Sequence, residues 1–325
     1  MKVAVDVTPL AQTRAGTARY LEALLPRLER EVEVSRVRGF ARGRPGTLWL
    51  DLAWYPHLLG IRARGADVLH CTTYRGPVHT RLPLVVTVHD VAVFRHPEAF
   101  PPWTRWYSRR VVPRVLRAAE VVLAVSAFTA AELVEVLGIP REKIRVVPNG
   151  VDPVFSPGGP AAEGDYVLAV GTLEPRKNLA RTIEATRSLG VELRVVGARG
   201  WGGVEASGDG VTWLGDVPDE ALARQYRGAR CLAYPSLYEG FGIPVLEAMA
   251  CGTPVVTSAG GATEEVAGGA AVLVDPRDPA AIARGIEAAG ARRSELRALG
   301  LRRAAEFSWD ESARLTVEAY REAAA

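Results

Sequence analysis

Two carboxylates stand close together in the second half of the chain, Glu239 and Glu247, at the ends of the string Glu-Gly-Phe-Gly-Ile-Pro-Val-Leu-Glu. Gly240 and Gly242 allow the backbone to turn sharply and approach a ligand, and Pro244 suits the first turn of a helix. A helix start presents free N–H groups and a partial positive charge, which favour a phosphate. A carboxylate can accept hydrogen bonds from two adjacent hydroxyls. The string therefore predicts a phosphate at the helix start and a polyol beside each carboxylate, whereas an isolated pair at this spacing would also fit one solvated and one helix-stabilising glutamate.

A second set of polar groups occurs in the string Gly-Thr-Leu-Glu-Pro-Arg-Lys-Asn-Leu. Arg176 and Lys177 stand on a turn between a predicted strand and a predicted helix, and Asn178 is predicted to cap that helix. Two cations beside a helix start suit a diphosphate, although a solvated basic turn explains them equally well without further context. His89 follows an apolar strand, where α/β sheets hold ligands. A buried structural histidine is the alternative at that position.

These strings resemble the donor-binding motifs of glycosyltransferase family 4 (group 1), a family of retaining sugar transferases with the GT-B fold, and the second string resembles mannosyltransferase-like members. One departure is Thr172, which stands where many members have an arginine, and we predict that Arg176 replaces it. The resemblance implies that Glu239 and His89 contact the donor sugar, that Glu247 holds the ribose diol, and that the loop ending at Val217 lies beside the base. It also implies that Lys177 and Gly16 contact the β-phosphate. Phosphate and sugar oxygens would bind the backbone of Gly240, Phe241, Gly242 and Ile243.

The implied reaction moves a sugar from a nucleotide-sugar donor, with GDP-mannose favoured, to a hydroxyl of a glycan or glycolipid acceptor. Negative charge then develops on the β-phosphate, where cations and backbone N–H groups can stabilise it. The sequence contains neither an Asp-x-Asp string, a common device for binding a metal and a diphosphate, nor a P-loop, so neither a metal nor another cofactor is expected. No residue stands out as a nucleophile. The resemblance implies front-face transfer with retention, in which the leaving phosphate accepts the proton of the acceptor.

Apolar runs alternate with amphipathic segments in both halves of the chain, a pattern that predicts an α/β protein with doubly wound parallel sheets. A linker rich in proline and glycine, residues 148–160, separates the halves. We predict an acceptor-side Rossmann-like domain at 1–154 and a donor-binding Rossmann-like domain at 155–308, facing each other across a cleft. The resemblance implies that the last helix, residues 309–325, crosses back to the first domain. The Arg- and Gly-rich residues 38–46 are predicted to form a mobile loop.

Charge is spread unevenly along the chain. Residues 1–154 carry 22 Lys and Arg against 14 Asp and Glu, a net of +8, and the remainder carries 18 against 23, a net of −5. The sequence shows no apolar run that would span a bilayer and no signal peptide, so we expect a cytoplasmic protein without a nucleic-acid partner. The basic, aromatic segment Trp103–Arg117 is predicted to form one helix and is a candidate for peripheral contact with an anionic membrane. Alternatively, its rings cover the core and its arginines are solvated.

Two other functions remain open from the residues. A GT-B-fold sugar-nucleotide epimerase binds a similar donor without an acceptor, so donor incubated alone would yield an isomerised sugar. A non-enzymatic two-domain sugar-binding protein of the periplasmic type would need a signal peptide and would have no use for a cationic diphosphate loop. The missing signal peptide and the cationic Arg176–Lys177 loop both count against this sugar-binding alternative.

Overall fold

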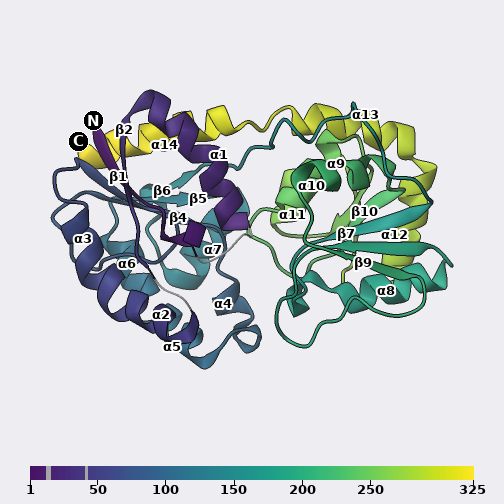
Figure 1. Cartoon of the computed structure of the whole chain (residues 1–325), viewed down its shortest axis with the longest axis horizontal. Coiled ribbons are helices and arrows are strands. Elements are labelled where there is room, and N and C mark those ends of the chain that lie inside the picture. The colour runs from purple at the N-terminus through teal and green to yellow at the C-terminus, as the bar shows by residue number, and fades with distance from the viewer. Residues whose placement is uncertain (12–15, 41–42) are drawn as a thin grey trace. The chain divides into compact units, whose positions relative to one another are not determined.

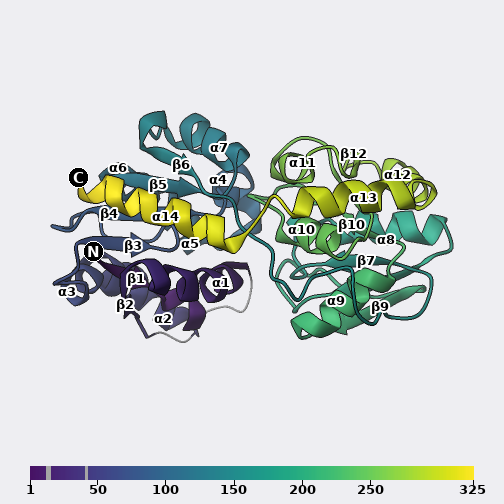
Figure 2. The same cartoon turned by 90° about the horizontal axis from the view of Figure 1, so that it is seen from above.

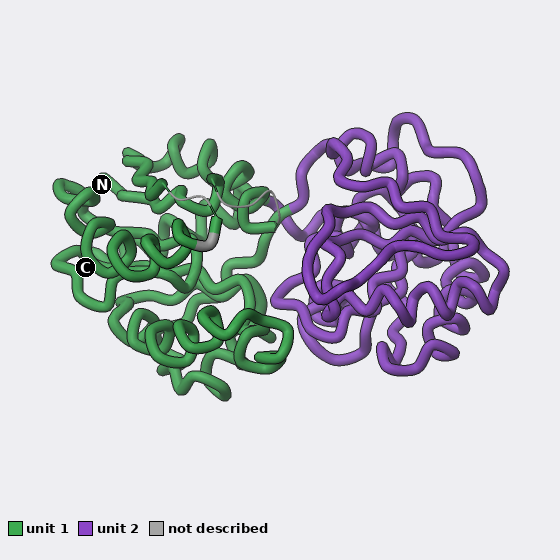
Figure 3. Tube along the Cα trace, turned by 60° about the horizontal axis from the view of Figure 1, so that its bottom comes forward, with its two compact units in different colours: residues 1–150, 309–325 green, residues 151–308 purple. Residues whose placement is uncertain are grey.

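The computed structural model describes residues 1–11, 16–40 and 43–325, and the chain divides into two compact units. Unit 1 comprises residues 1–150 and 309–325, and unit 2 comprises residues 151–308 (Figure 3). Each unit contains one six-stranded sheet in which every pairing is parallel. The predicted pair of doubly wound parallel sheets is therefore confirmed. Among the described residues, no helix combines the length and the apolar character needed to cross a bilayer.

The sheet of unit 1 has the strand order β2-β1-β3-β4-β5-β6. Its central strands consist mainly of β-branched and aliphatic residues and are buried, as expected of a parallel sheet covered by helices on both faces. The strands are β1 (Lys2–Asp6), β2 (Glu33–Val37), β3 (Val68–Cys71), β4 (Leu84–Val88), β5 (Val121–Ala124) and β6 (Ile144–Val146).

The helices of unit 1 connect these strands and cover the sheet (Figure 1). The α-helices are α1 (Gly16–Glu31), α2 (Gly43–Trp49), α3 (Leu59–Arg62), α4 (Ala92–Arg95), α5 (Pro102–Arg110), α6 (Val112–Ala118) and α7 (Ala127–Leu137). A π-helix, η2 (Leu50–Leu58), joins α2 to α3, and short 3-10 helices occur at η1 (Thr8–Ala11), η3 (Pro97–Ala99) and η4 (Arg141–Lys143).

Two predictions about this half need correction. The loop predicted at 38–46 is shorter than expected, because the chain is already helical from Gly43; residues 41–42 lie outside the described residues. The single helix predicted at Trp103–Arg117 is two helices, α5 and α6, which meet at Val111. Pro113 explains the break, because a proline within a helix removes a backbone hydrogen bond and clashes with the preceding turn.

The C-terminal helix α14 (Trp309–Ala324) belongs to unit 1 rather than to the unit that precedes it in the chain. Trp309, Val317 and Tyr320 are buried in the same hydrophobic core as Leu21 and Leu24 of α1. Figure 2 shows α14 lying along the strands of this unit. The predicted return of the last helix to the first domain is therefore confirmed.

Unit 2 has the strand order β12-β11-β10-β7-β8-β9. Its strands are β7 (Tyr166–Val170), β8 (Glu192–Val196), β9 (Val211–Gly215), β10 (Cys231–Tyr234), β11 (Val255–Ser258) and β12 (Val272–Val274). Its helices are η5 (Pro175–Lys177), α8 (Leu179–Ser188), α9 (Asp219–Gly228), α10 (Ile243–Ala250), α11 (Ala262–Ala267), α12 (Pro279–Ala291) and α13 (Arg293–Ala304). The short helix α11 was not predicted, because only six residues separate the glycine pairs on either side of it.

Candidate active site

The predicted cations and Glu239 lie where the strand order of unit 2 reverses. Counting from the first strand, the chain runs outward from β7 to β9 and then returns to β10 on the other side of β7. Ligands of doubly wound sheets bind beyond the carboxyl ends of the strands at such a switch point. Arg176 and Lys177 follow β7, and Glu239 follows β10, so both loops leave the sheet at this point.

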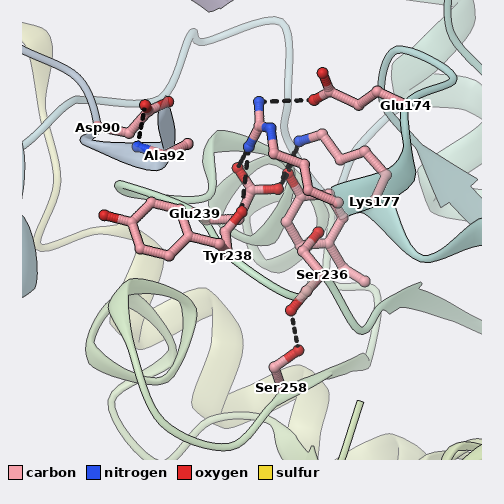
Figure 4. A network of polar contacts seen from close by, with 10 residues as sticks. Asp90, Ala92, Glu174, Lys177, Ser236, Tyr238, Glu239 and Ser258 are labelled. Carbon is pink, nitrogen blue, oxygen red and sulfur yellow. Dashed lines mark hydrogen bonds and ion pairs between the residues drawn. The ribbon is translucent and has the colours of Figure 1, made fainter. Parts of the chain in front are cut away.

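The carboxylate of Glu239 is held between the two cations (Figure 4). Its Oε1 lies 2.6 Å from Nζ of Lys177, and its Oε2 lies 2.8 Å from Nη1 of Arg176. The Tyr234 hydroxyl donates to Oε1 over 2.8 Å and accepts from Nζ of Lys177 over 2.6 Å. On its other side, Arg176 pairs with Glu174 over 2.7 Å. We call these five residues the ion-pair cluster.

Burial and charge act in opposite directions on this cluster. Burial raises the pKa of Glu239, but the charges of Lys177 and Arg176 outweigh it and lower that pKa to about 2. Burial also lowers the pKa of Lys177, an effect that Glu239 partly offsets. Two cations and two carboxylates neutralise one another, so an entering diphosphate would compete with the carboxylates for the same N–H donors.

Glycines bring the backbone close enough to form the cluster. Gly171 has a φ of 143°, and a Cβ there would lie 3.1 Å from Cε of Lys177, so the missing side chain makes room for the lysine. A Cβ at Gly197 would lie only 2.0 Å from the carbonyl oxygen of Gly171. The loops after β7 and β8 can therefore approach this closely only with glycine at 197.

Asn178 stands at the N-cap of α8, but the prediction that its side chain caps the helix is wrong. Its backbone is left-handed, with a φ of 60°, whereas the backbone of a capping residue is typically in the β region. The amide nitrogen donates instead to the carbonyl oxygens of Pro235, over 2.9 Å, and Pro276, over 2.6 Å. Asn178 thereby ties the Lys177 loop to the start of the loop that carries Glu239.

Glu247 lies on α10 and is 2% exposed. It accepts a hydrogen bond of 2.8 Å from the hydroxyl of Tyr226 on α9. The helix begins after Gly242, whose φ of 105° is favourable only for glycine, and Pro244 lies in its first turn as predicted. The ring of Phe241 packs edge-on against Phe307, and the residue is buried in unit 2.

Val217 is half-buried in the loop after β9. Since β9 is the edge strand, this loop leaves the sheet two strands away from the Lys177 loop after β7. The structure thus places Val217 at the same end of the sheet as the ion-pair cluster but not among its ion pairs.

The predicted residues of unit 1 gather at the start of α1. Gly16 is the first residue of α1, and Tyr20 lies one turn further along. The ring of His89 meets Tyr20 edge-on, with 4.8 Å between ring centroids. Its Nε2 lies 3.0 Å from the carbonyl oxygen of Thr72, so Nε2 carries a proton and donates it. Burial lowers the pKa of His89 against the opposing effect of that hydrogen bond, which favours the neutral ring with Nδ1 as an acceptor.

A buried polar chain lies behind His89. Tyr20 and Thr87 are hydrogen-bonded over 3.2 Å, Thr87 meets Nε2 of His70 over 2.8 Å, and Nδ1 of His70 meets the Tyr320 hydroxyl over 2.7 Å. Burial lowers the pKa of His70 to about 3, so the ring is neutral at pH 7. The chain connects α14 with α1 and with the strand that precedes His89. Sequence reasoning assigned nothing to His70 or Tyr320, because these contacts span up to 250 residues.

The structure therefore collects the predicted residues into two groups, one in each unit. Arg176, Lys177 and Glu239 are in direct contact in unit 2, and Gly16 and His89 lie near Tyr20 in unit 1. Glu174 and Tyr234 were missed, although Glu174 lies within the second string and Tyr234 lies five residues before Glu239. Within the described parts of the chain, no group of three or more His, Cys, Asp or Glu residues could hold a metal ion.

Comparison with known proteins decides the family. Residues 4–155 match the sequence model of Glycosyltransferase Family 4, and residues 155–300 match that of Glycosyl transferases group 1. O-antigen chain mannosyltransferase B of Escherichia coli is 34% identical over 286 residues, which cover 76% of this chain and 74% of that protein. This chain belongs to glycosyltransferase family 4. It is a glycosyltransferase, and the epimerase and sugar-binding alternatives are not favoured.

Two further proteins are similar to this glycosyltransferase, one in sequence and one in structure. D-inositol 3-phosphate glycosyltransferase of Geodermatophilus obscurus is 35% identical over 279 residues, covering 75% of this chain and 62% of that protein. Sucrose-phosphate synthase from Thermosynechococcus elongatus has a similar structure, with a TM-score of 0.80, 22% identity, and coverage of 99% of this chain and 98% of that one. The two sheets accordingly form the GT-B fold.

Proposed function

We propose that this glycosyltransferase moves a sugar, mannose in the favoured case, from a nucleoside diphosphate such as GDP to a hydroxyl of a glycan or lipid-linked glycan. The observation that carries the proposal is the ion-pair cluster, in which Arg176 and Lys177 lie half-buried at the switch point of unit 2. The mannosyltransferase name of the Escherichia coli relative supports the choice of sugar.

The cluster supplies the means to bind and release a diphosphate. Arg176 offers a planar fork of N–H donors and Lys177 a compact charge, and both would stabilise the negative charge that builds on the β-phosphate as it leaves. As the cations turn to the phosphate, Glu239 is released to accept hydrogen bonds from the sugar hydroxyls. Both cations already lie at this site before the ligand arrives, so binding requires only that they exchange Glu239 for phosphate oxygens.

The remaining donor contacts follow the same proposal. Glu247 would hold the ribose diol, exchanging or sharing its bond from Tyr226. The N–H groups of residues 240–243 at the start of α10 would bind phosphate and sugar oxygens. Neutral His89 would accept a hydrogen bond from the sugar. Among the described residues, a Cβ at Gly16 would meet no atom within 4 Å beyond its own helix and its chain neighbours, which leaves room for the β-phosphate.

Transfer would then occur on one face of the sugar. The bond between the anomeric carbon and the β-phosphate oxygen breaks, and a bond to the acceptor oxygen forms on the same face. The proton of the acceptor hydroxyl passes to the leaving phosphate oxygen, so that no protein base is required. Arg176, Lys177 and backbone donors carry the charge stabilisation, and we therefore propose a retaining, metal-independent reaction in unit 2 with the acceptor bound by unit 1. We also propose that the Trp103–Arg117 segment contacts the membrane that carries a lipid-linked acceptor.

A thermal-shift panel of GDP-, UDP- and ADP-sugars tests the donor, with and without EDTA. We expect GDP-mannose to raise the melting temperature equally under both conditions. Lys177→Met should remove this shift, whereas Lys2→Met, which breaks an exposed pair with Glu33, should retain it. If no nucleotide sugar stabilises the protein, or if the shift requires a divalent ion, the proposal is wrong. Incubation of donor alone should give no isomerised sugar.

A further inference from the structure

Glu174 is a buried carboxylate in the loop after β7 that makes none of the proposed donor contacts. Its side chain is 2% exposed, against 9% for Glu239. An ionised side chain is buried this deeply almost only where a charged partner compensates the loss of water. Arg176 is such a partner, and its Nη2 lies 2.7 Å from Oε1 of Glu174 (Figure 4).

The backbone around Glu174 holds this carboxylate in place. The N–H of Leu173 donates to the carbonyl oxygen of Ala198 over 3.0 Å, which joins the loops after β7 and β8. The backbone of Glu174 is extended, and its carbonyl oxygen accepts from the N–H of Lys177 over 3.1 Å, which closes the turn of η5. The Glu174 carboxylate therefore has a fixed support within the loop that carries both cations.

Arg176 is held through two different nitrogens of its guanidinium. Nη2 meets Glu174, whereas Nη1 meets Oε2 of Glu239 over 2.8 Å. Nη1 also donates to the carbonyl oxygen of Tyr238 over 3.2 Å. Because a guanidinium is planar and rigid, fixing Nη2 restricts the direction in which Nη1 points. The pair with Glu174 can therefore persist when another anion replaces Glu239 at Nη1.

We propose that Glu174 is a positioning residue for sugar transfer, which keeps Arg176 oriented while Nη1 exchanges Glu239 for the β-phosphate. This inference rests on the proposed function, in which the diphosphate replaces Glu239 at the cations. Without Glu174, Arg176 would keep its charge but lose an anchor, and its long side chain would gain rotamer freedom. Attraction to the diphosphate would remain. The oriented N–H that meets the charge developing in the transition state would be lost.

The variant Glu174→Gln separates charge from orientation, because it preserves the shape of the side chain. It removes one negative charge from a cluster of two cations and two carboxylates, so the site becomes more positive and should bind GDP at least as tightly as wild type. Its kcat should fall about 10- to 100-fold, because a small misplacement of a group that acts in the transition state has an effect of this size. A role in folding alone would lower stability without separating GDP affinity from turnover.

Calorimetry with GDP and steady-state kinetics with GDP-mannose measure these two effects. Turnover is followed as release of GDP, with water alone or with mannobiose as the acceptor. The matched control is Glu192→Gln, because Glu192 also pairs with an arginine of unit 2, Arg194, over 3.0 Å. Glu192 lies at the amino end of β8, whereas the ion-pair cluster lies beyond the carboxyl ends of the strands. This control should keep both the GDP affinity and the kcat of wild type.

Two further variants keep the test independent of any loss of stability. Glu174→Asp retains the charge but withdraws the carboxylate from Nη2 by one methylene, so it should also combine wild-type GDP affinity with a reduced kcat. In a double-mutant cycle, Glu174→Gln should change kcat by less than about twofold once Arg176→Met has removed the guanidinium. Such non-additivity would show that Glu174 acts through Arg176.

The outcomes distinguish this proposal from the proposed function. The role of Glu174 alone is refuted if both of its variants keep the wild-type kcat, if kcat and GDP affinity fall together, or if Glu174→Gln lowers kcat as strongly in the Arg176→Met background. If wild-type protein neither binds GDP nor releases it from GDP-mannose, the proposed function is refuted and the role of Glu174 with it.

Discussion

Replacing Glu239 by glutamine removes a buried charge while preserving the shape of the side chain. The Glu239 side chain is 9% exposed and contacts both Lys177 and Arg176. In Glu239→Gln, these two cations retain only Glu174 as a carboxylate partner within the ion-pair cluster. We therefore expect this variant to be less stable than wild type as well as inactive in sugar transfer.

The size of the effect follows from the pKa of Glu239. The interactions of the folded protein lower that pKa from 4.5 to about 2. A shift of this size corresponds to about 3 kcal/mol of folding free energy at neutral pH. Removing one partner from a buried ion pair typically costs about 3–5 kcal/mol, a range that agrees with the value obtained from the pKa. For a domain the size of unit 2, the loss should lower the melting temperature by about 6–12 °C.

The loss of folding stability in Glu239→Gln should depend on pH in a definite direction. Because folding lowers the pKa of Glu239, its ionisation stabilises the folded state fully above the unfolded value of 4.5. This contribution disappears as the pH falls towards about 2. The difference in free energy of unfolding between wild type and Glu239→Gln should therefore be constant near neutral pH and shrink below pH 4.5.

Urea unfolding of both proteins across this pH range measures the difference directly. Glu295→Gln is the matched control, because Glu295 forms an exposed ion pair with Arg292 in the same unit, with a side chain 54% exposed. Exposed pairs contribute little to stability because water and salt screen them, so the control should remain close to wild type. Equal stability of Glu239→Gln and wild type, or a difference that does not change with acid, would refute the reasoning.

Three further substitutions test the contacts that position the site. Both Asn178→Ala and Asn178→Gly lose the hydrogen bonds of the side-chain amide. Asn178→Ala should lower the melting temperature more, because glycine adopts the left-handed conformation of this position without strain and alanine does not. Gly197→Ala should prevent soluble expression, since its Cβ would overlap the carbonyl oxygen of Gly171. Tyr320→Phe removes the hydroxyl that is hydrogen-bonded to Nδ1 of His70. This variant should be destabilised by about 1–3 kcal/mol, measured by urea unfolding. Its kcat should be reduced more than its KM.

Local pattern was enough to predict most of the fold. The strand predicted before His89, the strand predicted before Arg176 and the helix predicted at the end of the chain are present as β4, β7 and α14, because an apolar run of strand length and an amphipathic run of helix length are each set by neighbouring residues. Pro113 escaped attention as a break between α5 and α6, and the short α11 was hidden between glycine pairs. The break is encoded locally by Pro113, whereas a helix as short as α11 depends on packing more than on its own sequence pattern.

The sequence by itself determined the sugar-transferase family, the two parallel sheets and the cations that accompany Glu239, because these depend on short strings and periodicity. Tertiary structure alone decided that Glu239 is bonded to both cations, that Asn178 ties two loops together, and that His70 is bonded to Tyr320. These partners are separated by 57 to 250 residues. Their contact arises from strand order and burial, which no local pattern encodes.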